Sequence, residues 1–280
     1  MTIDSHQHFW KFDPSRHDWI NEDMRAIRRD FMPEDLWPLL KARCIDGSVV
    51  VQVDQNEEEN QFLLRLAEEY DFIKGVVGWV DFKMYGLEEE LQRLSTQRKL
   101  KGFRHIVQGE PRGFLNGPSF LRGVKALRGT RFTYDLLVYH YQLEESIKFV
   151  RKIGDVKLVV DHLAKPSIST GETESWKKNM QAIASFENVS VKLSGMVTEA
   201  SWQGWSEKDF EPYLDTMFNL FGVRRLMYGS DWPVCLVAAT YDEQAEIINS
   251  YISRLSSDER ERVLGGNAVD FYGLPKVEKV

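Results

Sequence analysis

The sequence predicts an α/β fold, namely a single (β/α)8 barrel of the TIM type that spans residues 1–280. Two observations lead to this prediction. Eight short runs rich in β-branched and aromatic residues recur along the chain, and segments with helical spacing lie between successive runs. The length of 280 residues also falls within the range of roughly 200 to 400 residues that one such barrel occupies. No long linker rich in Pro, Gly or Ser interrupts the pattern, so we expect one domain.

The predicted strands alternate with the predicted helices throughout. The strand runs cover residues 2–9, 47–54, 73–82, 100–108, 131–139, 156–163, 189–196 and 225–232, and the helical segments include 60–70, 87–94, 119–129, 143–153, 175–186 and 209–221. Runs such as SVVVQV and KLVVDHL are apolar with little alternation, which is typical of parallel strands buried on both faces. A doubly wound open sheet is the alternative fold, but no GxGxxG motif follows an early strand.

The composition excludes several classes of protein. With 42% hydrophobic and 28% charged residues the chain is typical of a globular domain, and no run approaches the roughly 20 apolar residues of a membrane span. The net charge of -7 argues against a nucleic-acid partner. The first residues lack the pattern of a signal peptide, so we expect a cytoplasmic protein. Cys44 and Cys235 show no CxxC spacing and predict neither a disulfide framework nor a cysteine zinc site. The sequence leaves a homo-oligomer open.

The histidines are unevenly distributed. Five of the six follow or end a predicted strand, namely His6, His8, His105, His140 and His162. The carboxyl ends of all eight strands of a barrel meet at one mouth, so residues far apart in sequence become neighbours there. The distribution therefore predicts an active site at that mouth.

His6 and His8 are two residues apart on a strand, so both imidazoles should point the same way. Imidazole nitrogen and carboxylate oxygen suit zinc, and His162 with Asp231 of the eighth run would complete a set of four ligands. A pair of hydrogen-bonded core histidines would show the same spacing, and an aspartate such as Asp231 also occurs as an N-cap or turn residue. Both readings stay open at this point.

Two long loops are expected beside this mouth, at residues 10–32 and 195–208. They carry Trp10, Trp19, Trp202 and Trp205. These tryptophans predict either an aromatic lid over the site or the packing of each loop against the rim of the barrel.

Five motifs in order, DSHQHFW, KGFRHIVQ, DLLVYHYQL, DHLAKP and GSDWP, resemble the amidohydrolase superfamily of the amidohydrolase 2 type. They are most similar to its sugar lactonase branch, which includes L-fuconolactonase and L-rhamnonolactonase. The resemblance implies metal ligands at His6, His8, His162 and Asp231, with Asp231 and His162 catalytic. Binuclear members carry a lysine or glutamate at the end of strand four, where this chain has Arg104. The departure implies one divalent ion, zinc, or no metal at all.

The expected activity is hydrolysis of a sugar lactone, an aldono-1,4-lactone, to the aldonic acid, with Asp231 activating water. Substrate contacts are expected from side chains near the mouth, namely Arg104, His105, His140, Trp10 and Trp232. Neighbours on a strand point to opposite faces, so at most one of Arg104 and His105 should face the barrel interior. The alternatives are a zinc-dependent decarboxylase of an aromatic acid and a noncatalytic sugar-binding barrel.

Overall fold

The computed structural model describes residues 1–275 and contains one sheet of eight parallel strands in chain order. The strands are β1 (Ile3–Gln7), β2 (Gly47–Val51), β3 (Ile73–Gly78), β4 (Leu100–Ile106), β5 (Thr133–Leu137), β6 (Leu158–Val160), β7 (Val189–Leu193) and β8 (Leu226–Tyr228). Each falls within one of the runs predicted from the sequence, so the (β/α)8 barrel is confirmed.

The first and last strands meet and close the ring of strands. The backbone N–H of Asp231 donates to the carbonyl oxygen of His6 at 2.8 Å, and the N–H of His8 donates to the carbonyl of Trp232 at 2.7 Å. Gln7 pairs in parallel with Trp232 at the same place. The residues that follow β8 are thereby held directly beside those that end β1.

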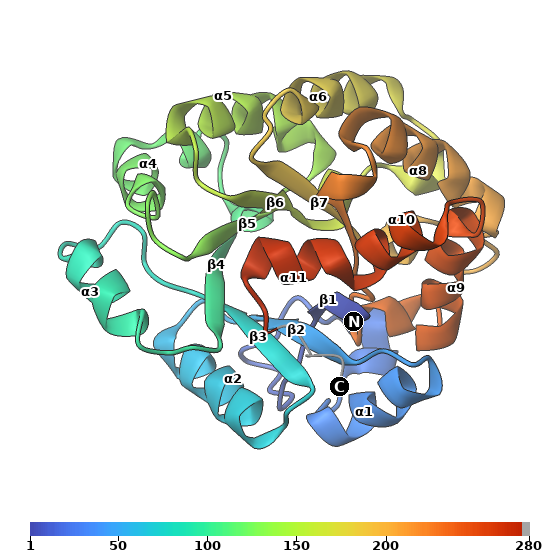
Figure 1. Cartoon of the computed structure of the whole chain (residues 1–280), viewed down its shortest axis with the longest axis horizontal. Helices are drawn as coiled ribbons and strands as arrows, with labels where there is room; N and C mark the ends of the chain where they lie inside the picture. Colours follow the sequence, from blue (N-terminus) through green and yellow to red (C-terminus); the bar gives the residue numbers. More distant parts are fainter. Residues whose placement is uncertain (276–280) are drawn as a thin grey trace.

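The helices surround the strands as the outer layer (Figure 1). Those between or after the strands are α1 (Pro33–Ala42), α2 (Glu57–Glu69), α3 (Leu87–Leu94), α4 (Pro118–Lys125), α5 (Leu143–Ile153), α6 (Glu174–Ala184), α7 (Met196–Glu199), α8 (Glu207–Phe221), α9 (Tyr241–Ile252), α10 (Ser257–Glu261) and α11 (Asn267–Tyr272). No helix within residues 1–275 has both the length and the apolar character needed to cross a membrane.

Helix α11 differs from the others because it lies across the ring of strands (Figure 1). Its residues Val269 and Tyr272 belong to a cluster of buried apolar side chains together with Ile3, Val49 and Met227 of the strands. The hydroxyl of Tyr272 reaches a β5 carboxylate inside the barrel. Helix α11 therefore seals the amino-terminal end of the barrel, and the carboxyl-terminal end is left for the site.

Candidate active site

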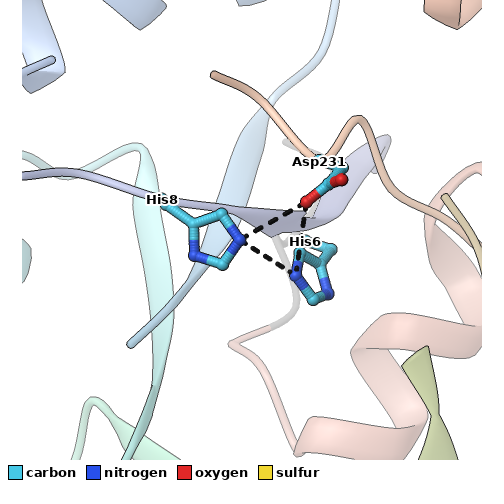
Figure 2. Close-up of side chains that lie close together, drawn as sticks. All are labelled: His6, His8 and Asp231. Carbon is cyan, nitrogen blue, oxygen red and sulfur yellow. Dashed lines mark hydrogen bonds and ion pairs between the residues drawn. The ribbon is translucent and has the colours of Figure 1, made fainter. Parts of the chain in front are cut away.

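The four predicted metal ligands lie together at the carboxyl ends of β1, β6 and β8. The Nε2 atoms of His6 and His8 are 3.2 Å apart, and Asp231 Oδ1 lies 3.4 Å from His8 Nε2 and 3.8 Å from His6 Nε2 (Figure 2). The Nε2 atom of His162 is also 3.8 Å from Asp231 Oδ1. The sequence placed these residues on three separate strands, and the barrel brings them into one small volume.

The backbone carbonyl of Val51, on the adjacent strand β2, orients His8. Its Nδ1 lies 2.7 Å from the carbonyl oxygen of Val51, which only accepts, so Nδ1 carries the proton. The Nε2 atom of His8 therefore has a free lone pair, and this atom faces Asp231. Such a hydrogen bond behind the ring is the usual support of a metal-binding histidine.

His162 lies in a strained turn directly after β6. Residues 162–165 all have left-handed backbone, with φ between 48° and 58°, a conformation that costs about 1–2 kcal/mol for each residue other than glycine. The indole of Trp176 donates to the carbonyl of Leu163 at 2.7 Å and holds the turn. Gly195 leaves room for the imidazole, because a Cβ atom there would lie 2.5 Å from His162 Nδ1. Strain of this kind is common at functional sites.

Burial determines which of these groups carry charge at neutral pH. Removal from water lowers the pKa of His8 and lowers that of His162 to about 4, so both imidazoles are neutral. Burial opposes ionisation of Asp231, but the neighbouring imidazoles, that of His162 first, outweigh it and hold the pKa of this carboxyl below its usual value. Asp231 is therefore an anion facing neutral imidazoles.

The donor atoms of this cluster suit a zinc ion. Tetrahedral zinc with bonds of about 2.0–2.1 Å to nitrogen and oxygen places its ligand atoms about 3.3 Å apart. The donor atoms of His6, His8 and Asp231 lie 3.2 to 3.8 Å from one another, near that value. His162 Nε2 lies 3.8 Å from Asp231 Oδ1 but outside this group of mutually close donor atoms. The Nε2 atom of His8 directs a free lone pair toward the Asp231 carboxylate, as two ligands of the same cation would be arranged. The residues present therefore fit the metal that the resemblance implies.

A cavity of about 320 Å³ opens onto the cluster. Its polar lining comes from His8, Arg104, Gln108, Tyr139, His162, Lys165 and Asp231, and its apolar lining from Trp19, Val53, Ile106, Leu137 and Val234. This volume suits a small polar molecule with one apolar side. Trp19 is 40% exposed and forms part of the wall, so one of the tryptophans of the 10–32 loop does lie beside the site.

Arg104 and His105 take opposite faces of β4, as the alternation of the strand requires. Arg104 faces the barrel interior, lines the cavity and places its Nη1 3.2 Å from Asp161 Oδ2. His105 faces the helices, where it lies 2.7 Å from Glu110 and stacks on Phe114 with ring centroids 4.8 Å apart. Arg104 therefore lines the cavity and His105 does not, and a substrate contact by Arg104 stays a prediction.

Three further residues that were expected to contact the substrate do not line this cavity. His140 lies in a different hollow and approaches the carbonyl oxygen of Lys165 at 2.9 Å. Trp10 and Trp232 are only 2% and 1% exposed because both pack against Phe31. Both rings support the rim of the barrel, and for Trp10 this is the packing of its loop against the rim that the sequence left open.

Several residues of the site were missed by the sequence analysis. Asp135, Asp161 and Lys192 are buried inside the barrel beneath His6, and Lys192 Nζ lies 2.6 Å from Asp135 Oδ2 and 3.1 Å from Asp161 Oδ1. Tyr139 lines the cavity. The available signal was a charged residue inside an apolar strand, as in VSVKL and FTYDLL, since such residues are seldom buried without a partner.

Curated relatives share the full length of the chain. It is 38% identical over 288 residues to the L-fucono-1,5-lactonase of Burkholderia multivorans, covering 99% of this chain and 97% of that protein. It is 34% identical over 284 residues to the L-fucono-1,5-lactonase of Burkholderia ambifaria, with coverage of 99% and 97%.

Solved structures agree with the fold. A crystal structure of an amidohydrolase from Burkholderia multivorans with bound zinc superimposes with a TM-score of 0.93 at 39% identity, covering 98% of this chain and 100% of that one. The family model described as amidohydrolase matches residues 3–274. The resemblance predicted from the five motifs is confirmed, and the chain belongs to the amidohydrolase family.

Proposed function

We propose that this protein hydrolyses the ring ester of a sugar lactone to the aldonic acid. The observation that carries the proposal is the meeting of the Asp231 carboxylate with three imidazoles and Arg104 at one end of a small cavity. The two curated relatives named L-fucono-1,5-lactonase, at 38% and 34% identity over nearly the whole chain, support the same class of substrate.

Asp231 acts as the base in this proposal. Because its pKa is held low, the carboxylate is ionised throughout the neutral range and can accept a proton from water. The water oxygen forms a bond to the carbonyl carbon of the lactone, and the bond from that carbon to the ring oxygen then breaks. The proton on Asp231 passes to the departing ring oxygen, and the new carboxylic acid loses its own proton to solvent.

Arg104 and Lys165 stabilise the negative charge that develops on the carbonyl oxygen. Both line the cavity, and both carry N–H groups that can donate to an oxyanion. Arg104 is held in place by Asp161 and by the carbonyl of Gln52. Donors that are fixed before the reaction need no reorganisation during it, which is the main source of such stabilisation.

The proposal includes one divalent metal, with His6, His8, His162 and Asp231 as its ligands. Zinc held by this set would supply Lewis-acid chemistry that polarises the lactone carbonyl and makes a nearby water more acidic. The crystal structure of the relative with bound zinc supports this choice of metal.

The ring size of the lactone is the finer part of the proposal. The sequence leads us to expect a 1,4-lactone, whereas the two relatives are named for a 1,5-lactone. The purified protein should therefore be given aldono-1,4-lactones and aldono-1,5-lactones side by side. Aromatic carboxylates belong in the same screen, because carbon dioxide without lactone turnover would indicate the decarboxylase instead.

The test is proton release measured with a pH indicator in weak buffer. Asp231→Asn should lower kcat by a factor of about 10² to 10⁴, the range for loss of a general base. Asparagine tolerates left-handed backbone, so the change at φ 58° does not disturb the turn. Asp155→Asn is the matched control, since the side chain of Asp155 is 84% exposed. Normal turnover by Asp231→Asn on the best lactone would refute the proposal.

A further inference from the structure

One side chain of the cavity has an amide group that no other part of the protein contacts by a hydrogen bond. Gln108 lies in the short turn η2 (Val107–Gly109) directly after β4 and lines the cavity of about 320 Å³. Within residues 1–275 its Oε1 atom is buried and accepts no hydrogen bond, and its Nε2 atom has no partner either but is not buried. The mechanism proposed above makes no use of this side chain.

An unpaired amide at this place calls for a partner that is not part of the chain. Buried polar atoms are nearly always hydrogen-bonded in native proteins, because an unpaired one is costly. Other buried oxygens of the described residues also lack a partner, but among them only Oε1 of Gln108 belongs to a residue that lines this cavity. The accessible Nε2 group can donate to a molecule bound there.

The alternation of β4 places Gln108 away from the reacting groups. Arg104, Ile106 and Gln108 are two residues apart and all line the cavity, whereas His105 and Val107 do not. Arg104 lies at the inner end, with its Nη1 3.4 Å from His6 Nε2. At about 3.3 Å per residue, Gln108 lies up to about 13 Å farther along the chain toward the mouth. Gln108 therefore meets the part of a substrate that is remote from the carbonyl.

The turn that carries Gln108 is fixed by a second glutamine. The buried Gln142 donates from Nε2 to the carbonyl oxygen of Val107 at 3.0 Å, and its Oε1 accepts from the backbone N–H of Tyr139 at 3.0 Å. Gln142 thereby joins the turn after β4 to the segment after β5, and Tyr139 lines the same cavity. A donor held on a fixed turn loses little freedom when a ligand binds to it.

The space beside Gln108 is open, and the group itself is uncharged. Gly109 also lines the cavity, and a Cβ atom built there would meet no atom within 4 Å. A neutral amide suits a hydroxyl group, whereas a carboxylate is bound more strongly by a cation such as Arg or Lys. The chemistry at this position therefore fits a hydroxyl of the ligand.

We propose that Gln108 is a specificity-determining residue that donates a hydrogen bond from its side-chain amide to a hydroxyl of the lactone, on the part of the molecule remote from the reacting carbonyl. A lactone without hydroxyls leaves the amide unpaired, so Gln108 selects for hydroxylated lactones. The proposal rests on the proposed function for the class of substrate, and it adds the residue that contacts the hydroxyl.

The test compares two substrates in the wild-type protein and in Gln108→Met. One is the best aldonolactone of the screen described above, and the other is the unsubstituted lactone of the same ring size, γ-butyrolactone or δ-valerolactone. Methionine keeps the length of the side chain and removes the N–H groups. Gln108→Met should lower kcat/KM for the aldonolactone about tenfold, the scale of one hydrogen bond, and leave kcat/KM for the unsubstituted lactone unchanged. The ratio of the two values should therefore fall about tenfold.

Gln55→Met is the matched control. The Oε1 atom of Gln55 accepts from the backbone N–H of Ile106 at 2.7 Å, and Gln55 does not line the cavity. This change should lower the free energy of unfolding in urea and leave the ratio as in the wild-type protein. Gln108→Met should show the opposite pattern, because no protein group loses a hydrogen bond. A destabilised Gln108→Met with the wild-type ratio would assign a structural role to Gln108 and overturn the proposal.

Binding of the aldonates that correspond to the screened lactones, measured by calorimetry, separates this proposal from the proposed function. A wild-type protein that hydrolyses no lactone would refute the function, and the role of Gln108 is then decided by binding. Gln108→Met should weaken the binding of the tightest aldonate about tenfold. Equal affinity of the two proteins, or no binding of any aldonate by the wild-type protein, would overturn the proposal. An equal change in kcat/KM for both lactones would overturn it as well.

Discussion

Glu59 of α2 is a buried carboxyl group whose ionisation should make the stability of this protein depend on pH. The side chain is 6% exposed and accepts a hydrogen bond from the backbone N–H of Val53 at 3.0 Å. Burial raises its pKa from the ordinary value of 4.5 to about 7, despite that hydrogen bond. Val53 lines the cavity, so this carboxyl group supports the wall of the candidate site from behind.

The direction and size of the effect follow from this pKa. The folded protein binds the proton of Glu59 more tightly than the unfolded chain, so the associated stability is fully present below about pH 4.5 and is lost as the pH rises through about 7. A difference of about 2.5 pKa units, at about 1.4 kcal/mol each, amounts to about 3 kcal/mol. Glu59→Gln keeps an acceptor for Val53 and removes the ionisation.

The assay is urea unfolding of the wild-type protein and of Glu59→Gln at several pH values from 5 to 8. The variant should gain about 3 kcal/mol relative to the wild-type protein between these limits, or as much of that as the window covers. Glu58→Gln is the matched control, because Glu58 is the exposed neighbour on the same helix. A constant difference between Glu59→Gln and wild type across this range would refute the reasoning.

The adjacent pair on β4 gives a second prediction. Arg104→Lys should lower kcat/KM by a factor of about 100, because a lysine cannot both hold Asp161 and face the cavity. His105→Gln should leave kcat unchanged and lower the free energy of unfolding by about 1 kcal/mol. Steady-state kinetics with urea unfolding checks both, and equal kinetic losses would contradict the assignment of faces. Lys165→Gly should lower kcat without loss of stability, because glycine adopts φ 48° freely and only the stabilisation of the developing oxyanion is removed. A destabilised but fully active variant would instead indicate a structural role. Trp19→Ala should raise KM about tenfold by removing part of the apolar wall, and an unchanged KM would exclude Trp19 from the substrate site.

The sequence predicted the barrel well because its signal is local and repeated. Eight apolar runs, each followed by a segment with helical spacing, leave few other folds, and the HxH spacing of His6 and His8 places two imidazoles on one face of a strand. Positions at strand ends were equally informative, since the barrel gathers them at one mouth. His162 and Asp231 could therefore be predicted as neighbours of His6 although they are far from it in sequence.

Residues just beyond a strand were harder to place. His140 follows β5 and Trp232 follows β8, yet neither lines the cavity, because the direction of a side chain after the last paired residue depends on the turn. The left-handed backbone at residues 162–165 contains no glycine, the residue that would have indicated this conformation in the sequence. It exists because Trp176 and the surrounding packing hold it there, and no local pattern encodes that contact.

The sequence by itself determined the fold, the family and the four side chains that could bind a metal, because each depends on spacing and on the order of elements. Only the tertiary structure decided which face each strand residue takes, how large the cavity is and how Lys192 meets His6. Those contacts join β7 to β1, 186 residues apart in the chain. A pairing across the interior of a barrel depends on side-chain packing and charge compensation, which a linear pattern does not contain.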